Sequence, residues 1–285
     1  MKPIYPTIGE KRKNPFKFNT YFYRSAMSLG AIGFEATQTM ASACANSKAP
    51  FNTGEGGLSI HHLPNVKFNY QKYFKYHKIS KLFKPIYKLI PTKRLKNNFI
   101  DIMGKITCEK NKRDLYLFDE KFFLFYAINW KAPLGVFPKT GELDDSFGHI
   151  IFQLGSGLYG LREKRNDDKI KLDHTRYKKI MTFCRGTEIK LAQGAKQSGG
   201  ILKSIKNTET ISEIRGVNPN IDLISPNRFP FYQKNKESDF FDFIEKLSEE
   251  SNGKPVGIKL VISSEQNIEP IAKELNKRKG KSGPD

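Results

Sequence analysis

Short apolar segments alternate with helical segments over the second half of the chain, and this rhythm constrains the fold more than any other feature. Strands are expected over 150–154, 188–191, 223–225 and 257–262, spaced about 34–38 residues apart. Because parallel strands need long crossover connections, usually helices, the pattern predicts an α/β protein with a parallel sheet.

The segments between these strands carry helix signals. Asp173 is a candidate N-cap, and Pro270 is expected in the first turn of its helix. One helix is amphipathic, and its inner face is expected to hold Phe240, Phe241, Phe243, Ile244 and Leu247. The four predicted helices cover 173–184, 208–215, 238–251 and 267–279.

The first part of the chain adds a strand over 23–29, a helix over 33–45 and a strand over 49–51. About six βα units result, and eight would close a (β/α)8 barrel of the TIM type. We therefore expect an incomplete barrel in which Ser282–Asp285 approaches a seventh strand. The predicted organisation is a basic arm or docking segment over 1–20 and a partial barrel over 21–285, with an insertion over 61–147.

The insertion follows the second predicted strand and contains an unusual basic segment. Residues 67–96 hold many lysines and no Asp or Glu, with apolar residues between the lysines. The pattern is typical of a basic amphipathic helix broken at Pro85 and Pro91. It fits a solvated helix packed on the main domain, or one that docks on an acidic membrane surface or on nucleic acid. We expect no specific nucleic-acid partner.

The whole chain is strongly basic, with a formal charge of +20 that favours anionic partners such as phosphorylated cofactors. Its three cysteines are far apart and lack metal-ligand spacing, so no metal site is expected. No signal peptide or spanning segment is evident. We expect a cytoplasmic protein, with membrane association through 67–96 as an alternative.

One glycine-containing stretch, 187–200, carries most of the candidate chemistry. In a strand, Lys190 and Ala192 share a face, and the following loop can bring Gln193 and Lys196 close to a ligand. Two lysines and an amide suit an anionic, planar-ringed ligand. The alternative is a surface strand with two solvated lysines.

Several motifs occur in an order that resembles the FMN-binding domain of the glutamate synthase family, closest to its short, stand-alone members. The resemblance covers about 21–60 and 148–285. The motifs are Ser25-Ala26-Met27-Ser28-Leu29-Gly30, Asn52-Thr53-Gly54-Glu55-Gly56-Gly57, Gln153 with Ser156-Gly157, the run 190–196, Ile224-Ser225-Pro226, and Gly257-Ile258-Lys259-Leu260-Val261.

The resemblance implies FMN at the carboxyl ends of the barrel strands. It places Ser28 and Gln153 near the flavin, and Lys190 and Lys259 beneath or beside the ring. Three further residues would line the space over the ring, where the substrate binds. They are Glu55 and Lys196, the candidate catalytic residues, and Gln193, which together with Lys196 would bind the substrate.

The implied function is that of an FMN-dependent oxidoreductase, which converts 2-oxoglutarate to glutamate by reductive amination or acts on a related 2-oxo acid. The electron donor is unknown. In this family an arginine usually follows the Ser-Gly pair, where Leu158 stands here, and the segment that holds the FMN phosphate would follow Asp285. We therefore expect a C-terminally truncated member. The alternatives are an inactive barrel fragment and a basic scaffold that binds acidic lipid or nucleic acid.

Overall fold

The computed structural model describes residues 5–63, 148–162, 171–194 and 199–285, together with short pieces between 85 and 134. Most of the predicted insertion, and most of the basic segment 67–96, lie outside the described residues. The predictions of membrane or nucleic-acid docking made for that segment therefore stay predictions. In the described part, no helix combines the length and the apolar character needed to cross a membrane.

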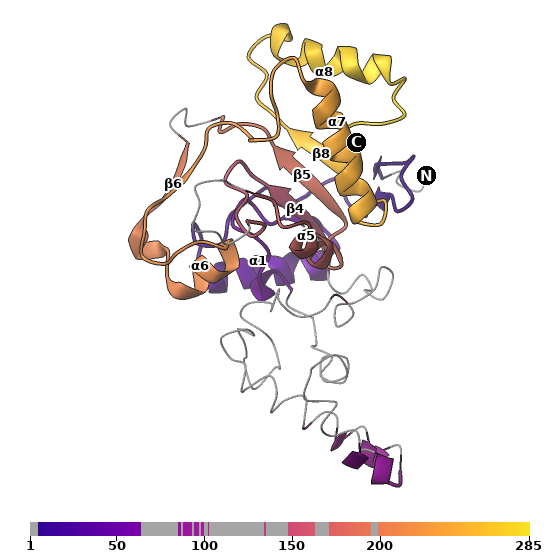
Figure 1. The fold of residues 1–285 in the computed structure, drawn as a ribbon, viewed down its shortest axis with the longest axis vertical. Coiled ribbons are helices and arrows are strands. Elements are labelled where there is room, and N and C mark those ends of the chain that lie inside the picture. The colour runs from indigo at the N-terminus through magenta and orange to yellow at the C-terminus, as the bar shows by residue number, and fades with distance from the viewer. Residues whose placement is uncertain are drawn as a thin grey trace.

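A parallel sheet of four strands forms the centre of the described structure (Figure 1). Its strands are β3 (Pro50–Asn52), β4 (His149–Leu154), β5 (Gly186–Lys190) and β8 (Val256–Lys259), in the spatial order β3-β4-β5-β8. The expected α/β class and parallel pairing are confirmed. The sheet is open within the described residues, so the structure does not show a closed barrel.

The two faces of this sheet differ in chemistry because successive side chains of a strand point to opposite sides. One face is buried and apolar, with Phe51, Ile150, Phe152, Leu154, Ile189 and Val256. The opposite face, which we call the polar face, carries Asn52, Gln153, Glu188, Lys190 and Lys259.

Four helices supply the apolar core together with the buried face of the sheet. They are α1 (Phe34–Ser47), α5 (His174–Met181), α7 (Glu237–Glu250) and α8 (Glu265–Lys277). The predicted inner face of α7 is confirmed, since Phe240, Phe241, Ile244 and Leu247 are buried and Phe243 packs against them. The Asp173 cap is also confirmed, because its carboxylate accepts a 2.8 Å hydrogen bond from the Arg176 backbone N–H.

A smaller unit lies beside the sheet and has an apolar cluster of its own. It contains β6 (Gly200–Leu202), the 3-10 turn η4 (Ser204–Lys206), α6 (Glu209–Arg215) and β7 (Leu223–Ser225). β7 pairs antiparallel with β6, so the prediction that it joins the parallel βα series was wrong. The middle residue of β7 is exposed, which fits a two-stranded ribbon better than an interior strand covered on both faces.

Two other expectations also need correction. Residues 23–29 form no regular strand; Arg24 pairs with Phe51 and Leu29 with Ile32, each through an isolated bridge. Four of the six predicted strands therefore lie in the parallel sheet. Helix α8 begins at Glu265, two residues earlier than predicted, so Pro270 lies in its second turn rather than its first. Because proline lacks an N–H, one intrahelical hydrogen bond is missing there.

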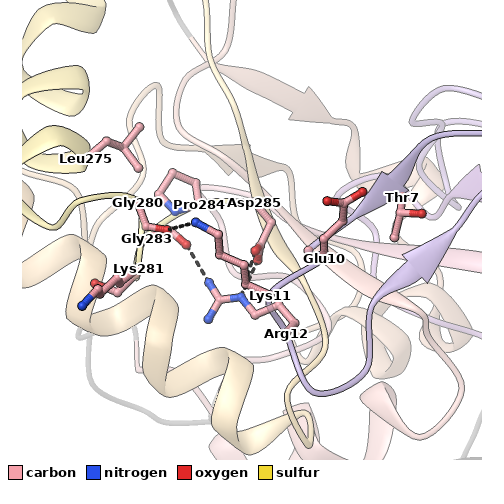
Figure 2. Close-up of a pocket in the computed structure, with 12 residues that line it drawn as sticks. Thr7, Glu10, Lys11, Arg12, Leu275, Gly280, Lys281, Gly283, Pro284 and Asp285 are labelled. Atoms are coloured by element: carbon pink, nitrogen blue, oxygen red, sulfur yellow. Dashed lines mark hydrogen bonds and ion pairs between the residues drawn. The ribbon is translucent and has the colours of Figure 1, made fainter.

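The N-terminal segment packs against the C-terminal end of the chain. It forms a hairpin of β1 (Thr7–Ile8) and β2 (Phe16–Lys17), and Arg12 lies in the loop between them. Arg12 binds Glu245 of α7 and Asp285, so the two ends of the described chain lie side by side (Figures 1 and 2). Asp285 also pairs with Val256, the first residue of β8, where the sequence predicted the approach of a further strand.

A cavity of about 310 Å³ lies at this junction, and Figure 2 shows its lining residues. Lys11, Lys281 and Asp285 contribute polar groups to its wall. Because Asp285 is bonded to the first residue of β8, the cavity lies toward the amino ends of the parallel strands. Ligands of open α/β sheets bind at the carboxyl ends, so this cavity is not our candidate site.

Candidate functional site

The candidate site lies where the parallel strands end. Loops begin after Asn52 of β3, Leu154 of β4 and Lys190 of β5, and parallel strands bring their carboxyl ends to one edge of a sheet. The loops carry Glu55 and Gln193, which are two of the predicted site residues. The edge therefore gathers residues that are up to 138 positions apart in the sequence.

Glu55, Lys190 and Gln193 form a closed triangle of hydrogen bonds at this edge. Lys190 Nζ donates to Glu55 Oε2 and to Gln193 Oε1, at 2.6 Å in both cases. Gln193 Nε2 in turn donates to Glu55 Oε1 over 2.8 Å. The side chains of Lys190 and Glu55 are only 18% and 15% exposed, so water screens their attraction less than it would at an open surface.

Neighbouring groups fix the position of Glu55. Its backbone N–H donates to Ser28 Oγ over 2.9 Å, which brings a predicted flavin-side residue into the same site. Gly155 leaves room for the carboxylate, because a Cβ at that position would overlap Glu55 Oε1. The Ser156 hydroxyl donates to the Pro226 carbonyl and lies 3.5 Å from Gln193 Nε2. The structure thus shows a polar centre built from the loops that follow β3, β4 and β5, together with Ser28 and Pro226.

A second polar cluster lies on the polar face and centres on Glu188, two residues before Lys190 on β5. Its Oε1 accepts hydrogen bonds from Gln153 Nε2 at 2.6 Å and from Asn52 Nδ2 at 2.9 Å. Burial, together with the Glu188 charge, raises the pKa of Tyr23 above its ordinary value. We did not predict a role for Glu188 from the sequence. The signal was its i−2 spacing from Lys190, which puts both side chains on one face of the strand.

The two strand-end lysines are neighbours across the sheet. Lys190 of β5 lies directly beside Lys259 of β8 in the parallel register, so both belong to the polar face. Lys259 is exposed, and in the described ranges it has no carboxylate partner. Lys196 lies outside the described residues, so its predicted catalytic and substrate-binding roles remain predictions.

Some strongly perturbed groups lie away from this edge. Lys254 is buried just before β8, and its ammonium donates to the Cys184 carbonyl over 2.7 Å. Burial lowers the pKa of Lys254 to about 8 and raises that of the Cys184 thiol to about 12. Both residues precede their strands, at the amino edge of the sheet, so we interpret them as structural. No group of three His, Cys, Asp or Glu in the described part could hold a metal ion.

Comparison with known proteins identifies related sequences. The family model described as "Conserved region in glutamate synthase" matches residues 2–281. The chain is also similar to the "Glutamate synthase large subunit-like protein YerD" of Bacillus subtilis (strain 168), with 32% identity over 194 residues. That match covers 62% of this chain and 36% of the relative, so it spans little more than a third of the relative's length.

Proposed function

The chain belongs to the glutamate synthase family, a family of oxidoreductases, and from this premise we propose that it binds FMN along the carboxyl edge of its sheet. We further propose that it takes part in the reductive amination of a 2-oxo acid, with 2-oxoglutarate as the first candidate. The Glu55–Lys190–Gln193 triangle at this edge is the observation that supports the proposal most directly.

The residues of the polar face fit a flavin ring in their donor and acceptor chemistry. The ring is flat and carries carbonyl oxygens and ring nitrogens, which amides and ammonium groups can bind. Gln153 supplies an amide, while Lys190 and Lys259 supply ammonium groups from adjacent strands. Bound FMN would supply hydride transfer to the substrate.

The two lysines would have different roles in this arrangement. A reduced flavin ring carries negative charge, which a fixed ammonium group stabilises. Lys190 is already paired with Glu55, whereas Lys259 has no carboxylate partner in the described ranges. We therefore assign charge stabilisation mainly to Lys259. Lys190 donates two of its three protons within the triangle, which leaves its third N–H for a ligand.

The triangle would also bind and orient the substrate. A 2-oxo acid presents a carboxylate and a carbonyl oxygen, and both groups need hydrogen-bond donors. Gln193 Nε2 is a suitable donor, although it is bonded to Glu55 in this structure. Substrate binding would therefore exchange this internal hydrogen bond for one to the ligand. We propose that Lys196, three residues further along the sequence than Gln193, adds a cation.

Titration of the purified chain with FMN, followed by flavin fluorescence, tests the proposal. We expect the wild-type protein to bind FMN, and its reduced form to be reoxidised by a 2-oxo acid with ammonia. Lys190→Ala should weaken FMN or substrate binding by about ten-fold or more, as expected for a lost charge-assisted hydrogen bond. Lys203→Ala is the matched control, because Lys203 forms an exposed ion pair with Asp222.

Two results would contradict the proposal. The first is a wild-type chain that does not alter FMN fluorescence at any concentration tested. The second is a Lys190→Ala protein that matches Lys203→Ala in both FMN affinity and substrate-dependent reoxidation.

A further inference from the structure

Glu188 is a carboxylate to which two side-chain amides converge from the adjacent part of the sheet. Its Oε1 accepts from Gln153 Nε2 on β4 and from Asn52 Nδ2 on β3. A carboxylate only accepts hydrogen bonds, so each amide must turn its NH2 group toward Glu188. The carboxylate thereby determines which end of each amide faces the rest of the site.

The orientation of Asn52 connects Glu188 to the triangle. With its nitrogen on Glu188, Asn52 turns Oδ1 to the Gly54 backbone N–H, which donates to it over 2.9 Å. Gly54 immediately precedes Glu55, whose carboxylate binds Lys190. Loss of the Glu188 carboxylate would free the Asn52 amide to rotate and would loosen the loop that carries Glu55.

The orientation of Gln153 has a different consequence. Its backbone N–H is held by Thr53 Oγ1 at 3.0 Å, and its side-chain nitrogen is held by Glu188. The amide oxygen is therefore turned away from Glu188 and can accept a hydrogen bond from a ligand N–H. If the carboxylate were absent, the amide could present either end to a ligand.

We propose that Glu188 is a positioning residue that fixes the Asn52 and Gln153 amides, so that Gln153 presents an acceptor to the ligand and the 53–57 loop places Glu55 against Lys190. The part of this inference that concerns the ligand rests on the proposed function, because the ligand is taken to be FMN. The positioning itself concerns only residues of this chain and can be tested without FMN.

Two substitutions at Glu188 separate acceptor chemistry from side-chain volume. Glu188→Gln keeps a carbonyl oxygen that can accept from both amides, whereas Glu188→Met has a similar length but no comparable acceptor. Glu188→Ala is the second variant without an acceptor, in case the Met variant does not fold. Glu269→Ala is the control, because Glu269 forms an exposed pair with Lys273 within α8.

The side-chain NH2 signals of Asn52 and Gln153, recorded by NMR on the 15N-labelled full chain, are the first readout. Loss of the corresponding signals in Asn52→Ser and Gln153→Ala assigns them. We expect Glu269→Ala to keep the wild-type signal positions, and Glu188→Gln to keep both pairs away from the positions of free amides. In Glu188→Met both pairs should move to the positions of free amides. Unchanged signals in Glu188→Met or Glu188→Ala would overturn the inference.

FMN affinity, measured by fluorescence on the same proteins, is the second readout. We expect Glu188→Met to weaken binding about ten-fold, and Glu188→Gln to stay within about three-fold of wild type, in line with one lost or retained hydrogen bond to a charged group. If wild type does not bind FMN, the proposed function fails, and the NMR signals alone decide the positioning role. If wild type and Glu188→Met bind FMN equally, the inference fails while the proposed function stands.

Discussion

Arg12 joins the N-terminal hairpin to the C-terminal part of the chain, and replacing it with alanine tests how strongly this junction stabilises the fold. Its Nη1 and Nη2 donate to the two oxygens of Glu245 at 2.7 and 3.0 Å. Its Nε donates to both oxygens of Asp285 at 2.8 and 2.9 Å, and its Nη2 also donates to the Gly283 carbonyl at 2.6 Å. The Arg12 side chain is only 12% exposed.

The cost of Arg12→Ala follows from what its partners would lose. Removing one member of a buried ion pair costs about 3–5 kcal/mol. Glu245 is 28% exposed and retains the Gly283 N–H, and Asp285 retains the Val256 N–H, so we take the lower end, about 3 kcal/mol. Burial disfavours the Arg12 charge, but the hydrogen bonds that Arg12 donates to Glu245 and Asp285 outweigh burial and raise the pKa of Arg12 above its ordinary value.

Urea unfolding of wild type and Arg12→Ala, followed by circular dichroism, measures this loss. A decrease of about 3 kcal/mol corresponds to a fall in Tm of about 6–12 °C for a chain of this size class. Lys203→Ala is the control and should change stability by less than about 0.5 kcal/mol, because the Lys203–Asp222 ion pair is exposed to solvent. An Arg12→Ala protein within about 1 kcal/mol of wild type would refute the reasoning, because the partners would then not depend on Arg12.

Three further predictions concern other parts of the structure. Gly155→Ala should displace the Glu55 carboxylate and weaken FMN or substrate binding; unaltered binding would contradict this role for Gly155. Gly160→Ala should cost about 2 kcal/mol or more in urea unfolding, because Gly160 has a φ of +84° and a Cβ there would lie 2.5 Å from Gly57 Cα. Burial and then the Arg24 charge lower the pKa of His62 to about 3. Between pH 6.5 and 3 the unfolded chain therefore binds a proton at His62, whereas the folded chain does not. Stability should therefore fall over that range by up to about 1.4 kcal/mol per pH unit, and His62→Gln should flatten the profile.

The helices were predictable because their signals are local. Asp173 accepts from the Arg176 N–H, and Thr208 from the Ile211 N–H, each three residues ahead. The buried face of α7 was likewise predictable from the spacing of apolar residues within that one helix. Each of these features depends on residues that are neighbours in the sequence, so the pattern predicts the element regardless of the rest of the chain.

The number of sheet strands was less predictable because pairing depends on what lies nearby in space. Residues 223–225 have the composition of a buried strand, and the structure pairs them with 200–202 in a local antiparallel ribbon. The antiparallel pairing requires only a connection of about twenty residues between the two strands. A parallel strand would have to join the central sheet through a crossover on the correct face. The apolar composition of the segment does not distinguish the two cases.

The part of the candidate site on β5 and its following loop was predictable, because the alternation of side chains along a strand determines which residues share a face. Lys190 and Gln193 were expected near one ligand, and the structure brings them together with Glu55. A role for Glu188 was not predicted, because the lysines of this stretch indicate an anionic ligand, which a carboxylate would repel. Its role depends on amides from β3 and β4, and a single sequence does not show which strands lie next to each other.

The polar face also limits how β5 can pair with its neighbours. A shift of one residue would place Ile189 at the site and turn Glu188 and Lys190 toward the apolar core. Burying two charged groups away from Asn52, Gln153 and Glu55 would cost far more than the few hydrogen bonds that the shifted strand retains. The residues that we propose to hold the ligand therefore also specify the register of the sheet. Replacing them together with apolar residues should leave a sheet with less specific pairing, even if its burial of apolar surface increases.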